Sequence, residues 1–84
     1  RMGRSFDIIY VGPPFPMFRH PSDKAALLDL ADRLAEGGAL KPTGVLIVQS
    51  DERDALPETT RALRLEDRRE YGRNALSFYR RAGV

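Results

Sequence analysis

The stretch FDIIYVGPPF, residues 6–15, decides how this chain folds. Its first six residues, 6–11, are mostly apolar and partly β-branched, which predicts a strand buried on both faces, as in a parallel sheet. Gly12-Pro13-Pro14 must end that strand, because proline lacks the amide donor that a sheet ladder needs and has a fixed φ. We therefore expect the diproline to mark the carboxyl end of a sheet strand.

A helix is expected over residues 22–36, ahead of the paired glycines at 37–38. Ser22 is predicted to be the N-cap, with Asp23 in the first turn, where the helix dipole favours a negative charge. Apolar residues recur with helical spacing on one face: Leu27, Leu30, Ala31 and Leu34. The opposite, polar side is expected to carry Asp29, Asp32, Arg33 and Glu36. This pattern predicts an amphipathic helix that packs against a sheet.

The rest of the chain predicts further strands. Residues 41–44, KPTG, predict a turn, and residues 45–48 predict a second buried strand that extends to Gln49 or Ser50. Strand, crossover helix and strand form one right-handed βαβ unit. After a polar loop at 51–58, a hairpin is expected, with strands at 61–71 and 75–81 around a turn at 72–74. The predicted fold class is α/β: a β-α-β unit followed by an antiparallel β-hairpin.

Composition limits the functional classes that remain open. The 84 residues contain no cysteine, which excludes disulfides, cysteine metal sites and thiol nucleophiles. No run of about 18 apolar residues is present, so no membrane span is expected and a cytoplasmic location fits. The net charge of +2 permits nucleic-acid binding without requiring it. Because Arg1-Met2 leads almost directly into a strand, the 84 residues are expected to be a fragment, or one part of a larger protein.

Arginines gather in the hairpin region, at positions 61, 64, 68, 69, 73, 80 and 81. The leading interpretation is a solvated surface with salt bridges, because acidic residues are interleaved with the arginines. A patch that faces phosphate groups is the alternative.

The diproline segment is the candidate chemical site. The carboxyl ends of strands are where ligands bind in open α/β sheets. The carbonyl groups of Pro13 and Pro14 lack local amide partners and can accept hydrogen bonds, and the ring of Phe15 can stack on a flat heterocycle. Such a turn suits the exocyclic amino group of a base. On these residues alone, the alternative is that the prolines only end the strand and Phe15 fills the core.

Residues 12–15, GPPF, resemble the motif of amino-group methyltransferases, which is usually Asp or Asn, then Pro-Pro, then Tyr or Phe. Residues 6–11 look like the fourth strand of that family's sheet, and residues 44–57, GVLIVQSDERDALP, look like its fifth strand and the following loop. Residues 69–80, REYGRNALSFYR, are similar to the closing hairpin of the ribosomal RNA guanine-N2 methyltransferases, the RsmD family. The resemblance covers nearly the whole chain.

This resemblance implies the C-terminal half of a Rossmann-like methyltransferase sheet. The cofactor would be S-adenosyl-L-methionine and the partner ribosomal RNA or the small ribosomal subunit. Gly12, Pro13, Pro14 and Phe15 would form the catalytic pocket for the target guanine, with Phe15 stacked on the base. The cofactor would be held mainly by an N-terminal half that the 84 residues lack, so the fragment alone is expected to be inactive.

Two departures from the family pattern keep alternatives open. Gly12 has no side-chain acceptor where the family has Asp or Asn, and no glycine-rich loop after a first strand is present. One alternative is an amino-group methylase that acts on DNA adenine, protein glutamine or a small amine. The other is a degenerate, non-catalytic module that binds RNA.

Several further residues are assigned smaller roles. Arg19, His20 and Lys24 are candidate RNA contacts, with a simple solvent-exposed loop as the alternative for His20. No metal site is expected, because the single histidine has no cysteine or second histidine as a partner. The polar loop carboxylates, Asp51, Glu52 and Asp54, are not expected to be catalytic, and Tyr79 is expected to pack on the sheet. The apolar strand at 6–11 predicts an exposed edge that pairs with the missing half or with another copy.

Overall fold

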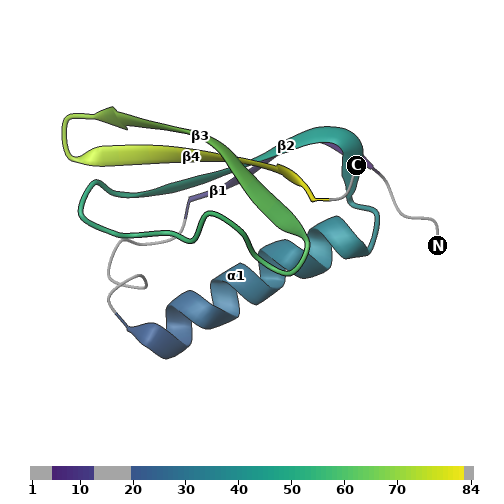
Figure 1. The fold of residues 1–84 in the computed structure, drawn as a ribbon, viewed down its shortest axis with the longest axis horizontal. Helices are drawn as coiled ribbons and strands as arrows, with labels where there is room; N and C mark the ends of the chain where they lie inside the picture. Colours follow the sequence, from purple (N-terminus) through teal and green to yellow (C-terminus); the bar gives the residue numbers. More distant parts are fainter. Residues whose placement is uncertain (1–4, 13–19, 83–84) are drawn as a thin grey trace.

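The structure is a computed structural model, and it describes residues 5–12 and 20–82. Within these residues the elements are, in order, β1 (Phe6–Val11), α1 (Pro21–Glu36), β2 (Leu40–Asp51), β3 (Leu63–Tyr71) and β4 (Asn74–Arg81). The strands form one sheet in the order β1-β2-β4-β3, and α1 lies across one face of it (Figure 1). The predicted β-α-β unit followed by a β-hairpin is therefore confirmed.

The pairing of the strands determines which loops share an edge. β1 and β2 are parallel, whereas β4 is antiparallel to both β2 and β3. The carboxyl ends of β1 and β2 consequently lie at the same edge as the β3–β4 turn. We call this the carboxyl edge, and Gly12, Asp51 and Asn74 mark where β1, β2 and β4 meet it. The amino end of α1 lies on the same side of the molecule (Figure 1).

Helix α1 begins one residue earlier than expected. Its N-cap is His20, which makes no side-chain capping hydrogen bond, so the prediction of Ser22 as the N-cap is wrong. Pro21 occupies the first turn, where its missing amide proton costs nothing and its fixed φ suits a helix. At the other end, Gly38 has a φ of +87°, in the left-handed region that glycine tolerates after a helix.

The buried face of α1 is rotated from the expected stripe. Leu27, Ala31 and Ala35 are buried, whereas Leu30 is half exposed. Asp32, expected on the polar side, is only 4% exposed. The rotation follows from tertiary contacts, because small alanines let the helix approach the sheet and Asp32 has partners there.

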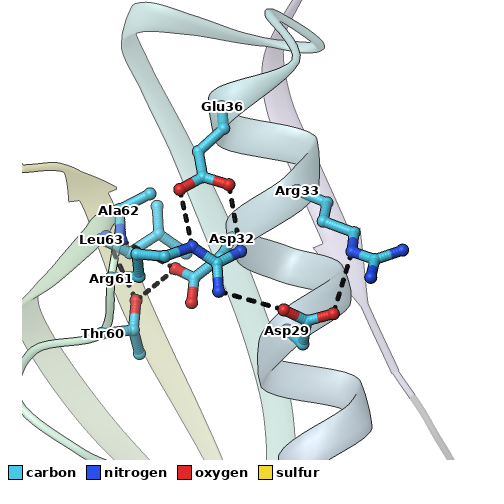
Figure 2. A network of polar contacts seen from close by, with 8 residues as sticks. All are labelled: Asp29, Asp32, Arg33, Glu36, Thr60, Arg61, Ala62 and Leu63. Atoms are coloured by element: carbon cyan, nitrogen blue, oxygen red, sulfur yellow. Dashed lines mark hydrogen bonds and ion pairs between the residues drawn. The ribbon is translucent and has the colours of Figure 1, made fainter.

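Those partners lie in the segment that precedes β3, as Figure 2 shows. Asp32 Oδ1 accepts hydrogen bonds from Thr60 Oγ1 at 2.5 Å and from the Ala62 amide at 3.0 Å. Thr60 Oγ1 in turn accepts a hydrogen bond from the Leu63 amide at 3.1 Å. The buried carboxylate therefore connects α1 to the start of β3, and its acceptor oxygen is satisfied.

Strand β2 is longer than the predicted strand, because the expected turn at 41–44 lies inside it. Phe6 pairs with Leu40 and Ile8 pairs with Val45, so the register of β1 against β2 shifts within this interval. The turn prediction is wrong for a physical reason: the irregularity in the ladder between β1 and β2 accommodates Pro42, which has no amide proton to pair. The backbones approach closely, since a Cβ on Gly44 would lie 2.9 Å from the Asp7 carbonyl oxygen.

The core lies between α1 and the sheet. Leu40, Leu46, Val48 and Leu63 are almost completely buried there, together with Tyr79. The Tyr79 hydroxyl donates a hydrogen bond to the Pro57 carbonyl at 2.7 Å. Burial raises the pKa of Tyr79 to about 12. The expectation that Tyr79 packs on the sheet is confirmed.

The other face of the sheet is not covered by any element that the structure describes. Phe6, Ile8 and Tyr10 are about half exposed or more on β1, which is an edge strand. Within the described part of the chain, the prediction that β1 is buried on both faces is therefore wrong, because α1 covers only one side.

The β3–β4 hairpin is tighter than predicted. Tyr71 pairs with Asn74, so the turn contains two residues, Gly72 and Arg73, instead of three. Gly72 has a φ of +61°, and a positive φ at only the first turn residue is typical of a type II′ hairpin.

Candidate functional site at the carboxyl edge of the sheet

The structure places the start of the predicted motif at the carboxyl edge. Gly12 follows β1 directly and is exposed. Pro13, Pro14, Phe15 and Arg19 lie outside the described residues, so their assigned roles remain predictions. The described part of the site consists of Gly12 and the side chains that surround it.

Gly12 lies against the ring of Tyr10. A Cβ atom on Gly12 would lie 2.9 Å from Tyr10 Cε2 and 3.3 Å from the Tyr10 hydroxyl oxygen. The tyrosine ring therefore occupies the space into which a side chain at position 12 would extend. Any larger residue at position 12 requires the ring to move.

The Tyr10 hydroxyl is the first member of a row of polar groups across three strands. It donates a hydrogen bond to Gln49 Oε1, and Gln49 Nε2 donates one to Asn74 Oδ1 at 3.4 Å. Sequence reasoning missed this row. The signal that could have found it is Gln49 itself, a polar residue at the end of an otherwise apolar strand.

The two described candidate RNA contacts lie at the amino end of α1. His20 is exposed at the N-cap. Lys24 Nζ donates a hydrogen bond to the Ala55 carbonyl oxygen, so in this structure it holds the loop that follows β2. Contact of either residue with RNA remains a prediction.

The acidic loop after β2 is stabilised by its own contacts. Asp51 is buried and accepts hydrogen bonds from the Arg53 amide at 2.9 Å and from Arg53 Nε at 3.0 Å. These contacts with Asp51 raise the pKa of the Arg53 guanidinium. Arg68 donates to the carbonyl oxygens of Glu52 at 2.8 Å and Asp54 at 3.2 Å. These contacts hold the loop in place and supply no catalytic arrangement of carboxylates.

Most of the hairpin arginines have acidic or carbonyl partners. Arg61 donates to both carboxylate oxygens of Glu36, at 2.7 and 3.0 Å, and to Asp29 at 3.1 Å. The hydrogen bond from Arg61 lowers the pKa of Glu36. Ion pairs also join Arg69 to Asp67 and Arg80 to Glu66. The interpretation as a salt-bridged surface is confirmed for these pairs. Arginines without an ion pair among the described residues are Arg64, Arg73 and Arg81.

The cavities that the described residues form do not suit S-adenosyl-L-methionine. The larger, about 540 Å³, lies along the outer edge strand β3, is open and has charged walls, and the smaller, about 270 Å³, is lined by Glu52, Arg53 and Arg73. The amino end of α1, at the carboxyl edge, begins with His20 and Pro21 and has no glycine-rich turn among the described residues. Pro21 offers no amide donor. Residues 5–12 and 20–82 therefore show no site that fits this cofactor.

In residues 5–12 and 20–82, no group of three or more His, Asp or Glu side chains is arranged to hold a metal ion. Within the same residues, α1 is too short and too polar to cross a bilayer.

Several solved structures share this fold over most of the chain. A conserved hypothetical protein from Streptococcus pyogenes is 19% identical, with a TM-score of 0.73, over 93% of this chain and 44% of its own. The Escherichia coli protein described as "Putative methyltransferase yhhF" is 24% identical, with a TM-score of 0.61, over 98% of this chain and 41% of its own. A Haemophilus influenzae protein described as a "putative methylase" is 22% identical, with a TM-score of 0.61, over 94% of this chain and 44% of its own.

This chain thus spans less than half the length of these solved chains. Comparison with curated proteins gives no significant match. Residues 1–80 match the protein family described as "Conserved hypothetical protein 95", and the chain belongs to this family.

Proposed function

We propose that this chain is the base-recognition part of a methyltransferase. The full-length enzyme would transfer a methyl group from S-adenosyl-L-methionine to the N2 amino group of a guanine in small-subunit ribosomal RNA. The family match over residues 1–80 supports this proposal. Further support comes from the Escherichia coli and Haemophilus influenzae proteins of the same fold, whose descriptions name a methyltransferase and a methylase.

The observation that carries the proposal is the position of Gly12. β1 is parallel to β2, and Gly12 follows β1 at the carboxyl edge, where open α/β sheets bind ligands. The next three residues in the sequence are Pro13, Pro14 and Phe15, which supply carbonyl acceptors and a ring that can stack on a base. This part of the enzyme would orient the amino group, and positioning of that kind accounts for much of the rate of a transfer reaction.

The cofactor belongs, in this proposal, to the remainder of the protein. The described residues do not form a pocket that fits it. The rest of the protein would also lie against the β1 edge and the uncovered face of the sheet, where Phe6 and Ile8 are exposed.

The test is methyl transfer by the full-length protein from labelled S-adenosyl-L-methionine to unmethylated small-subunit RNA. Replacing Phe15→Ala removes the stacking ring and is expected to lower kcat/KM about ten- to a hundredfold, since base stacking on an aromatic ring contributes about 1–3 kcal/mol. Leu30→Ala, which truncates a half-exposed apolar side chain on α1, is the matched control and should leave kcat/KM unchanged.

The outcomes separate the competing functions. Unchanged activity of the Phe15→Ala variant would refute the site assignment. Transfer to DNA, protein or a small amine in place of ribosomal RNA would identify another amino-group methylase. No binding of S-adenosyl-L-methionine by the full-length protein would indicate a non-catalytic module.

A further inference from the structure

We propose that the phenolic oxygen of Tyr10 accepts a hydrogen bond from the amino group of the bound base, in place of the side chain that Gly12 lacks. This inference rests on the proposed function and assigns a specificity residue to the same site. Tyr10 lies on β1, two residues before Gly12, on the sheet face opposite α1.

The first step of the argument is space. The Tyr10 ring fills the volume beside Gly12, with its hydroxyl oxygen 3.3 Å from the position of a Cβ on residue 12. A polar atom carried by a side chain at position 12 would extend into the region that the tyrosine oxygen now occupies. Glycine at position 12 and tyrosine at position 10 are therefore sterically matched to each other.

The second step is the polarity of the hydrogen bonds. Asn74 Oδ1 accepts from the Gln49 amide nitrogen, which turns Gln49 Oε1 toward Tyr10. Tyr10 donates its only proton to that oxygen. The phenolic oxygen then has lone pairs to offer and no proton, so it can only accept a hydrogen bond from an incoming ligand. An exocyclic amino group is a donor of the required kind.

The third step is access. The Tyr10 side chain is 56% exposed, whereas Gln49 and Asn74 are partly buried behind it. The strand register makes Tyr10 and Gln49, and then Gln49 and Asn74, diagonal neighbours on one face. The partly buried amides thus orient the hydroxyl, and the exposed phenol meets the ligand.

The test compares guanine with hypoxanthine, which lacks the exocyclic amino group. Once the methylated guanosine has been located, a short RNA with guanosine or inosine at that position is bound to the full-length protein without cofactor. The wild type is expected to prefer the guanosine RNA about tenfold. Tyr10→Phe is expected to reduce that preference severalfold, since one hydrogen bond of this kind contributes about 1 kcal/mol and the diproline carbonyls can still accept from the amino group. A change in overall folding would weaken the binding of both RNAs equally and would leave the preference for guanosine unchanged.

Two more variants complete the design. Tyr71→Phe removes an exposed tyrosine hydroxyl on β3 and should keep the full preference. Gln49→Leu removes the acceptor that orients the phenol and should reduce the preference severalfold. A wild type that methylates RNA, together with a Tyr10→Phe variant that keeps the preference, would overturn this inference alone. Absence of methyl transfer by the wild type would overturn the proposed function and this inference with it.

Discussion

At the scale of single residues, Tyr79 couples its ionisation to the stability of the fold. Its ring is 1% exposed, its hydroxyl donates to the Pro57 carbonyl, and burial raises its pKa to about 12 from an ordinary value of 10.0. The folded protein therefore holds the phenolic proton more tightly than the unfolded chain does. The resulting stabilisation is fully present below pH 10 and is lost as the pH rises through about 12.

We expect this group to lower the free energy of unfolding by on the order of 2–3 kcal/mol between about pH 10 and pH 12. Denaturant unfolding across this range measures the decline, and the Tyr79→Phe variant should show a shallower one, because phenylalanine has no proton to lose. Tyr71→Phe, at an exposed position, should decline as the wild type does. Equal slopes for Tyr79→Phe and the wild type would contradict this assignment.

At the scale of elements, Asp32 connects α1 to the segment that precedes β3 (Figure 2). Replacing Asp32→Ala leaves the partly buried Ala62 amide and the Thr60 hydroxyl without their shared acceptor. We expect the free energy of unfolding to fall by about 2–4 kcal/mol, as measured by denaturant titration. Asp32→Asn keeps an oxygen acceptor and should cost less.

The matched comparison for Asp32 is Arg61, which lies between Thr60 and Ala62 in the segment that precedes β3. Arg61→Ala breaks exposed ion pairs with Glu36 and Asp29, whose contribution is small and falls as salt is added. If Asp32→Ala lowers the free energy of unfolding no more than Arg61→Ala does, the buried carboxylate does not hold these elements together.

At the scale of the whole molecule, the exposed β1 edge predicts that the 84-residue chain associates with itself. Among the described residues, no strand pairs with the outer side of β1, and Phe6 and Ile8 beside it are exposed. We expect this chain alone to form dimers or larger species in sedimentation experiments. Ile8→Lys should shift the distribution toward monomer, because a charged side chain on an edge strand opposes pairing.

The control for the edge is Leu30→Lys, which replaces another exposed apolar residue, on α1 instead of on the edge strand, and should leave the association unchanged. A wild-type chain that sediments as a monomer at all concentrations would contradict the prediction.

The sequence by itself determined the elements, because the signals for them are local. Apolar runs predicted the cores of β1 and β2, and paired glycines predicted the end of α1. The position of Gly12 at the carboxyl edge also followed from the sequence, since a strand that ends at a diproline must present the next residues there.

Only the tertiary structure decided the features that depend on residues far apart in the chain. The helical spacing of Asp32 predicts a position on the polar, exposed side of α1. Its burial depends on Thr60 and Ala62, about 30 positions later in the chain. The row of polar groups beside Gly12 likewise requires three strands to meet. Local pattern reports the preference of a segment, whereas burial and hydrogen-bond partners depend on which distant segments pack against it.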